Sequence, residues 1–265
     1  MAVRPTFWAK LVVVATVAVA GHLAFARVFN LGADVGSVGA FVTAIGTLYS
    51  VLTAFTVVSV WTEFTDTDRS IKREARQLSE LWRYVGYVID VAGVATARQS
   101  IESYRDAVVH TEWPVMLQGG VPNAAEDEFF AMADAVNAMG VSTPKDVPAW
   151  TEAVRTLGEV SDARSDRILL MPLRMPPLLK VLLLMATATL IAGMALLGFK
   201  SEIIGTAVIV LTVGVSLLVL EVIDDIDEPL GGAWGVTARP FEQLRFSLAP
   251  SDEQRPDMVS GIRLE

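Results

Sequence analysis

The chain has 265 residues, of which 52% are apolar and only 19% are charged, and its mean hydropathy is +0.47. This composition is more apolar than that of ordinary soluble domains, and it predicts a membrane protein. The absence of cysteine excludes disulfides, thiolate metal sites and cysteine nucleophiles. The net charge of −9 argues against a nucleic-acid partner, because such proteins need clustered basic side chains.

Four stretches without charged residues are candidate transmembrane helices, because a bilayer core of about 30 Å needs about 20 helical residues. These stretches cover 11–26, 35–62, 181–199 and 203–220. The second is longer than a span requires, and the third and fourth fit. The first is short, and it spans only if Lys10 and Arg27 extend to the lipid headgroups and Trp8 and Phe29 lie at the interfaces.

A cleaved signal peptide is the alternative interpretation of the first stretch. Basic residues precede its apolar region, and Ala24, Phe25 and Ala26 resemble a small-residue cleavage site. The short loop that leads directly into the next span favours a transmembrane hairpin instead. Both interpretations leave the region after the second span on the same side of the membrane.

The distribution of basic residues predicts the orientation. Arg27 and Lys200 are the only Lys or Arg residues in the two short loops, and basic segments stay cytoplasmic. We therefore expect a multi-pass protein of the plasma (inner) membrane of a bacterium, with both termini in the cytoplasm. The expected domains are a first hairpin, a cytoplasmic domain, a second hairpin and a cytoplasmic tail, at 1–62, 63–177, 178–223 and 224–265.

The cytoplasmic domain is expected to be helical. It begins with apolar residues that recur at heptad spacing, joined by others four positions after each. These residues are Ile71, Ala75, Leu78, Trp82, Val85, Ile89 and Ala92. Asp66 or Asp68 is a candidate N-cap for this helix, and continuation of the second span into it is the alternative.

Three more helices and a turn-rich tail are expected after this stripe. The helices are predicted at 96–113, 124–139 and 148–170, with Pro114 ending the first of them. Glycines and a proline predict a loop at 119–123, and the chain from Pro229 onward is predicted to form turns. Residues 251–265 are expected to be poorly ordered.

The second span carries the most informative pattern. Thr43, Thr47, Ser50 and Thr53 share about a third of the helix circumference at about 100° per residue. Small residues in lipid usually mark close helix packing, and the alternative is a pore wall with an apolar gate. On the pore interpretation, the lining residues are Gly46, Ser50, Ala54, Leu48, Leu52 and Phe55.

Charged residues are absent from all four stretches, which argues against a proton-coupled transporter. His22 is the one imidazole at depth, and a structural hydrogen bond is its simplest role. After the fourth span, Asp224, Asp225, Asp227 and Glu228 gather hard oxygen ligands that suit Ca²⁺, although the spacing is not that of an EF-hand. The alternative is a solvated helix end whose acids pair with arginines of the cytoplasmic domain.

No catalytic motif occurs in the chain, and the sequence predicts that it is not an enzyme. Asp106 and Glu112 are a carboxylate pair that in principle performs acid–base chemistry. No nucleophile, phosphate loop or metal motif accompanies them. Structural ion pairing is the better interpretation of the segments that hold Tyr104, Glu112, Arg164 and Arg167.

Several segments, taken in order from about 36 to 241, resemble the bestrophin-like membrane proteins of bacteria and plants, a family without an established function. They are Trp61 at the end of the second span, Glu74-Ala75, Tyr104…Glu112-Trp113-Pro114, Arg164…Arg167, and Asp225-Ile-Asp-Glu-Pro229-Leu-Gly-Gly…Val236…Pro240-Phe241. That family is more distantly similar to bestrophins, which are pentameric anion channels with four membrane helices per subunit. Their second span has a pattern similar to Val51-Leu52, Phe55, Val57 and Trp61, so the resemblance implies that this span lines a fivefold pore.

Two features depart from the bestrophin pattern. Alignment on Val51-Leu52 puts Gly46, Ser50 and Ala54 where bestrophins have bulky constriction residues, whereas a shift toward Trp61 puts Leu48 and Leu52 there. Both registers stay open. The calcium clasp of bestrophins is not matched residue for residue by the acidic segment, so the resemblance does not extend to calcium gating, and Ca²⁺ is a candidate cofactor from the carboxylates alone.

The sequence therefore predicts an all-α integral membrane protein with four transmembrane helices and a helical cytoplasmic domain between the second and third spans. The leading functional hypothesis is a bestrophin-like ion channel that is homo-oligomeric, most simply a pentamer, and conducts inorganic anions across the lipid bilayer. The alternative is a non-conducting membrane scaffold or sensor. In that case the helix with the heptad-like stripe mediates assembly or binds a partner.

Overall fold

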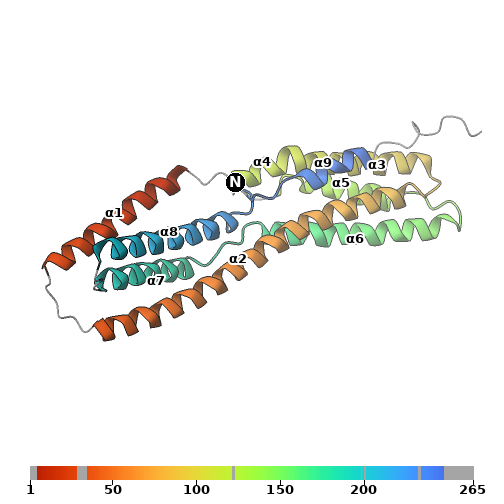
Figure 1. The fold of residues 1–265 in the computed structure, drawn as a ribbon. Coiled ribbons are helices and arrows are strands. Elements are labelled where there is room, and N and C mark those ends of the chain that lie inside the picture. The colour runs from red at the N-terminus through yellow and green to blue at the C-terminus, as the bar shows by residue number, and fades with distance from the viewer. Residues whose placement is uncertain are drawn as a thin grey trace, which may run out of the picture. The chain divides into compact units, whose positions relative to one another are not determined.

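A computed structural model describes most of the chain, and every regular element in the described part is a helix (Figure 1). The chain divides into two units, each considered separately. The first unit contains residues 1–66 and 173–235, and the second contains residues 67–172 and 236–265. The described residues are 5–28, 35–120, 123–197, 199, 201–231 and 234–247.

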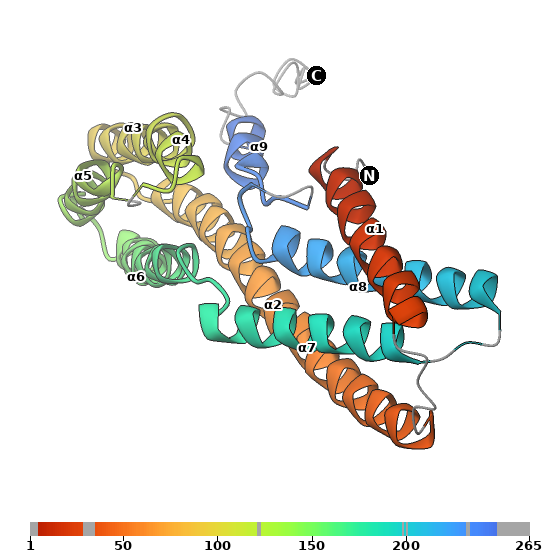
Figure 2. The same cartoon turned by 90° about the vertical axis from the view of Figure 1, so that its left-hand side faces the viewer.

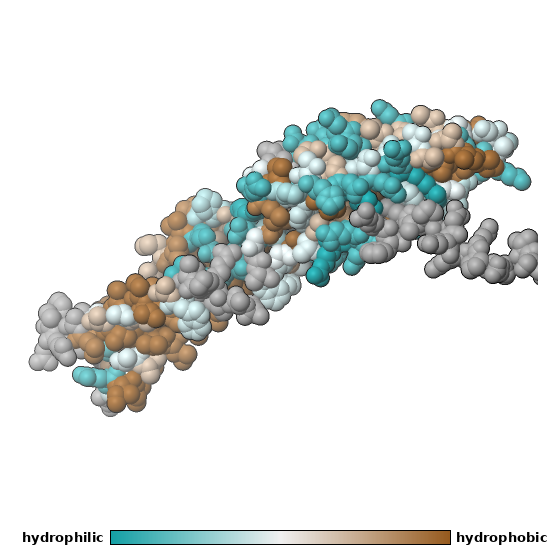
Figure 3. Space-filling view, turned by 90° about the horizontal axis from the view of Figure 1, so that it is seen from above, coloured by the Kyte–Doolittle hydropathy of each residue, from teal (hydrophilic) through white to brown (hydrophobic). Residues whose placement is uncertain are grey.

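The first unit holds the apolar helices. They are α1 (Pro5–Val28), the first part of α2 (Val35–Val85), α7 (Pro177–Leu196) and α8 (Glu202–Ile226). Helices α2, α7 and α8 are long and apolar enough to cross a membrane, whereas the apolar part of α1, Trp8–Leu23, is shorter. On the face seen in Figure 3, hydrophobic residues gather over the first unit, and hydrophilic residues are more frequent over the second. The predicted all-α class is therefore confirmed, and three of the four predicted spans are long and apolar enough to cross a membrane.

Close packing among α1, α7 and α8 organises the first unit (Figure 2). The Nδ1–H of His22 donates to the carbonyl of Ala195 at 2.9 Å, which ties α1 to α7. Helix α2 packs against α7 at Gly193, where an added Cβ would lie 2.9 Å from Cγ2 of Val42. Glycine is needed here because the two helices approach so closely.

Helix α2 is continuous from the first unit into the second, so neither Asp66 nor Asp68 begins a new helix. The second span therefore continues directly into the helix that carries the apolar stripe, which was the alternative interpretation of the sequence. The predicted apolar stripe is buried at its start, with Ile71, Leu78 and Val85 fully covered. Beyond Val85 the prediction is wrong, because α2 ends there and the periodicity is broken by a turn. Ile89 and Ala92 are exposed as a result.

The second unit continues with α3 (Val91–Ala107), a π-helical turn (Val108–Glu112) and α4 (Trp113–Leu117). The prediction that Pro114 ends a helix is wrong. The amide of Trp113 donates to the carbonyl of Val108, five residues back, so the backbone widens before the proline. Pro114 then occupies the first turn of α4, where its missing N–H costs no helical hydrogen bond.

Helices α5 (Glu126–Asn137), α6 (Asp146–Leu170) and α9 (Arg239–Ser247) complete the second unit. The expected helices at 124–139 and 148–170 correspond to α5 and α6 within two residues at each end. The expectation of turns throughout the tail is wrong at α9, because Phe241 is fully buried and its burial stabilises the helix. Residues 251–265, expected to be poorly ordered, lie outside the described residues.

Candidate functional site

Helix α2 has one free face within the first unit. Val51, Phe55 and Val58 are each about two-thirds exposed, at 64%, 65% and 64%. On the opposite side, Tyr49 and Val60 are buried in an apolar cluster with residues of α7 and α8. A membrane helix that exposes such a broad face in a single copy has room there for lipid, another subunit or a pore.

The two predicted rows of pore-lining residues lie on opposite sides of this free face. At about 100° per residue, the row of Gly46, Ser50 and Ala54 and the row of Leu48, Leu52 and Phe55 are about 170° apart. Four of these six residues are exposed, while Gly46 and Leu52 are half-buried. Val51 and Val58 lie between the rows, at the centre of the face, and neither was among the predicted pore-lining residues.

The small-residue flank borders a pocket of about 520 Å³ that is open to the surface of the first unit. Helix α2 contributes small and hydroxyl-bearing residues to its wall, α7 contributes Leu190, and α8 contributes the rest. The lining residues are Thr43, Gly46, Thr47, Tyr49, Ser50, Leu190, Leu211, Thr212, Val215 and Ser216. Gly46 and Ser50 were predicted functional residues, whereas the α7 and α8 walls were not.

The hydroxyl groups of this flank are hydrogen-bonded within their own helix. Thr43 donates to the carbonyl of Gly39, Thr47 to that of Thr43, and Ser50 to that of Gly46, at 2.8 to 2.9 Å. Their protons therefore point along the helix. These hydroxyl groups can therefore accept a hydrogen bond from another molecule, but their protons are already in use.

Tyr49 differs from these residues. Its side chain is only 9% exposed, and its buried hydroxyl has no hydrogen-bond partner among the described residues. An unpaired hydroxyl in an apolar setting costs about 1–3 kcal/mol, so such a group is informative. Tyr49 was not among the predicted site residues, although it is the one tyrosine in the apolar stretch 35–62.

The acidic residues after the fourth span lie at the end of α8. Asp224 pairs with Lys180 at 2.6 Å, and Asp227 accepts from the amide of Met175 at 2.7 Å. Both contacts join α8 to the start of α7. Among the described residues, no group of three or more acidic or imidazole side chains is arranged to hold a metal ion. The calcium site at Asp224, Asp225, Asp227 and Glu228 stays a prediction without support from this geometry.

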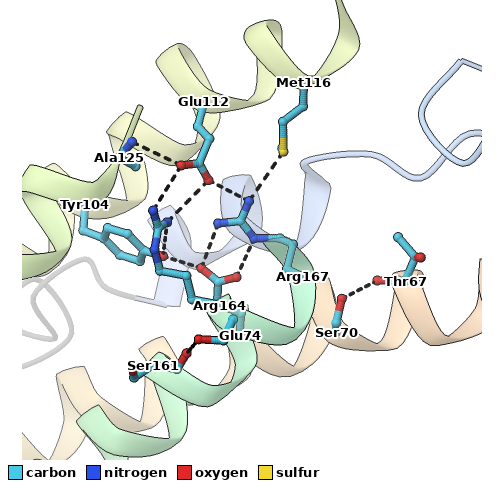
Figure 4. Close-up of polar contacts among 11 residues, drawn as sticks. Thr67, Ser70, Glu74, Tyr104, Glu112, Met116, Ala125, Ser161, Arg164 and Arg167 are labelled. Atoms are coloured by element: carbon cyan, nitrogen blue, oxygen red, sulfur yellow. Dashed lines mark hydrogen bonds and ion pairs between the residues drawn. The ribbon is translucent and has the colours of Figure 1, made fainter. Parts of the chain in front are cut away.

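The second unit contains a buried charge cluster formed by Glu74, Tyr104, Glu112, Arg164 and Arg167 (Figure 4). Arg167 lies between the two carboxylates, with 2.6 Å from its Nε to Glu74 and 2.7 Å from a terminal nitrogen to Glu112. Arg164 pairs with Glu112 at 3.3 Å. The hydroxyl of Tyr104 donates to Glu74 at 2.5 Å. Two arginines therefore balance two glutamates.

Electrostatics keep Tyr104 and Arg167 of the buried charge cluster in their protonated forms. Burial and the charge of Glu74 raise the pKa of Tyr104, so the phenol remains a donor. Burial acts to lower the pKa of Arg167, but Glu74 and Glu112 raise it, and the guanidinium remains charged. Arg167 and Glu74 are inaccessible to solvent, so the cluster is structural and offers no site to a substrate.

This cluster bears on two predictions from the sequence. Ion pairing was expected for the segments of Tyr104, Glu112, Arg164 and Arg167, and the structure brings these residues together. Asp106 does not join Glu112 as an acid–base pair, because it is exposed and pairs with Arg105. Glu74, which completes the cluster from α2, had no local signal for this role.

Comparison with known proteins gives one family match. Residues 6–241 match the family model described as the Bestrophin-like domain, and this range includes the free face of α2, the pocket and the buried charge cluster. Neither the curated proteins nor the solved structures contain a match to the chain.

Proposed function

Because this chain belongs to the bestrophin-like family, we propose that it is a channel subunit that assembles as a pentamer and conducts inorganic anions. The distant similarity of this family to the bestrophin anion channels supports conduction in general. In this proposal all four apolar helices span the membrane, with α1 extended by its flanking residues. Both termini and the second unit are cytoplasmic.

The free face of α2 is the observation that carries this proposal. A helix buried on one side against α7 and α8, and open on the other, is what a ring of subunits around an axis requires. Its centre is apolar, and no charged residue interrupts α2 from Val35 to Thr62. We assign Val51 and Val58 to the middle of the pore wall, with the two predicted rows on either side.

Selectivity in this pore has to arise without fixed charges. Thr47 and Ser50 donate to their own helix, so solvating an anion requires each hydroxyl to rotate and leave a backbone carbonyl. That exchange costs about 1 kcal/mol per hydrogen bond. We therefore propose that the apolar ring at Leu48, Val51 and Phe55 is the main barrier, because it makes an ion shed water.

Cysteine scanning tests the proposal cleanly, because the chain has no cysteine of its own. Single substitutions at 48, 51, 55 and 58 are expected to react with a charged aqueous thiol reagent and to reduce chloride flux in liposomes. Thr56→Cys is the matched control, because Thr56 lies on the same helix but is fully buried. Protection along the whole helix, or a native mass of one or two 28.6 kDa chains, would refute a shared central pore.

The second unit argues against the alternative hypothesis, in which the protein is a non-conducting scaffold. That hypothesis relied on the apolar stripe of α2 as an assembly surface. Ile71, Leu78 and Val85 are fully buried within the unit, so the stripe is not available to a partner.

A further inference from the structure

We propose that one end of the second unit binds the side of α5 in a second copy of the chain. This end, which we call the tip, consists of the turn at 86–91 after α2 and the connection at 139–147 between α5 and α6. The inference rests on the proposed homo-oligomer, because it names the surfaces through which two subunits meet. It is carried by exposed apolar residues and unpaired charges within the second unit.

Two aspartates hold the two segments of the tip together. Asp90 accepts a hydrogen bond from the amide of Gly140 at 2.8 Å. Asp146 accepts one from the amide of Ile89 at 3.2 Å. Both carboxylates therefore bind backbone amides of the other segment, and the tip has a defined surface in a single copy.

Apolar side chains are exposed on both segments of the tip. Val91 is 82% exposed and Tyr87 is 62% exposed, and three more apolar residues are exposed by 42% to 59%. The full set is Tyr87, Ile89, Val91, Val141 and Val147. Figure 3 shows hydrophobic residues at the right-hand end of the second unit, where the tip lies. Apolar side chains that gather in one place, rather than scattered singly, mark an interaction surface.

Three cations at the tip have no acidic partner among the described residues, and they are Arg83, Arg98 and Lys145. Arg98 reaches the tip from α3. Its guanidinium lies 4.7 Å from the centre of the Trp82 ring, and a Cβ at Gly86 would collide with its terminal nitrogen. The tip is therefore apolar and positive, on a chain whose net charge is −9.

The outer face of α5 has the complementary chemistry. Phe130 is 57% exposed there, while Met132 and Val136 on the inner face are buried. At about 100° per residue, three acidic residues lie within about 100° of Phe130 around the helix. They are Glu126, Asp127 and Asp134, all exposed and without a basic partner among the described residues. This face combines an aromatic anchor with three negative charges.

The tip and the outer face of α5 cannot meet within one copy, because α5 leads directly into the tip. Contact between the tip of one copy and α5 of the next is heterologous, and such contacts close into rings. A tip-to-tip contact would instead oppose like charges. An anionic bilayer suits the tip less well, because electrostatic binding to lipid uses clusters of about 4–8 basic residues.

Disulfide crosslinking tests this contact on the full chain in nanodiscs, because the chain has no cysteine of its own. A disulfide requires two Cα atoms within about 7 Å. Ala92→Cys/Ala131→Cys is expected to form covalent oligomers on oxidation, and each single substitution is not. Ala92→Cys/Ser165→Cys is the matched control, because Ser165 is exposed on α6 instead. Crosslinking through Ala92→Cys alone would mean a tip-to-tip contact and would overturn the proposal.

Charge reversal makes the test specific. Added to the crosslinking pair, Arg83→Glu/Lys145→Glu is expected to slow the reaction about ten-fold, and so is Asp127→Lys/Asp134→Lys. All four substitutions together should restore the rate, because the two surfaces are complementary again. Equal rates in the control pair, or no restoration, would refute the contact.

The native mass of the wild type separates this inference from the proposed function. A pentamer whose Ala92→Cys/Ala131→Cys variant does not crosslink overturns the contact and leaves the channel proposal intact, whereas a monomer refutes both. Labelling of the tip by a photoreactive phosphatidylglycerol, without crosslinking between copies, would assign the tip to the bilayer and overturn the contact as well.

Discussion

At the scale of single residues, one buried arginine joins several parts of the second unit. Arg167 is fully buried and contacts both Glu74 and Glu112, while its guanidinium also lies 5.9 Å from the ring centre of Phe241. The charge is tolerated only because two carboxylates compensate it. Removal of one partner therefore does more harm than the pair itself contributes to stability.

Glu74→Ala is accordingly expected to lower the free energy of unfolding by about 3–5 kcal/mol, because it leaves Arg167 undercompensated. Tryptophan fluorescence during denaturant unfolding in detergent measures this change. The matched control on the same helix is Arg73→Ala, which breaks the exposed pair with Asp166 at 3.4 Å and should cost less than about 1 kcal/mol. If both variants lost a similar free energy of unfolding, burial of the ion pair would not explain the effect of Glu74→Ala.

At the scale of helices, two glycines at the contact between α2 and α7 are expected to respond oppositely to an added methyl group. A Cβ at Gly193 would lie 2.9 Å from Cγ2 of Val42, and the β-branched valine has little freedom to move. A Cβ at Gly46 would meet Leu190 at 3.7 Å, which is an ordinary contact. Alanine at position 193 therefore tests steric crowding, whereas alanine at position 46 tests helix propensity.

We expect Gly193→Ala to destabilise the first unit by about 1–3 kcal/mol through overpacking. Gly46→Ala should be neutral, or stabilising by up to about 1 kcal/mol, because alanine favours the helix. Thermal unfolding of the two variants in the same detergent compares them directly. Equal destabilisation would mean that α2 and α7 are not packed as described.

The helices themselves were largely predictable, and the reasons for success and failure are physical. Long apolar runs in lipid have little choice but to be helical, because every backbone group must be paired internally. Pro114 and the tail were mispredicted, because a π-helical turn and the burial of Phe241 are tertiary effects. Glu74 and Arg167 are 93 positions apart, so no local pattern links them, and Tyr49 reveals its unpaired hydroxyl only once its neighbours are known.

At the scale of the whole molecule, the question is what covers the free face of α2 at Val51. Water, lipid and protein neighbours respond differently to a charge introduced there. In lipid at the centre of a span, a lysine costs about 2.5–3.5 kcal/mol, whereas in a water-filled pore it remains hydrated. Met185 on α7 offers a comparison, because it is similarly exposed, at 61% against 64% for Val51.

Val51→Lys is therefore expected to assemble normally and to increase chloride flux, since a ring of lysines attracts anions into an apolar constriction. Met185→Lys should reduce the yield of assembled protein, because its lysine faces lipid in the proposed arrangement. Size-exclusion chromatography followed by liposome flux measures both effects. If Val51→Lys lost assembly as severely as Met185→Lys, the face centred on Val51 would be covered by lipid or protein, and the pore would have to lie elsewhere.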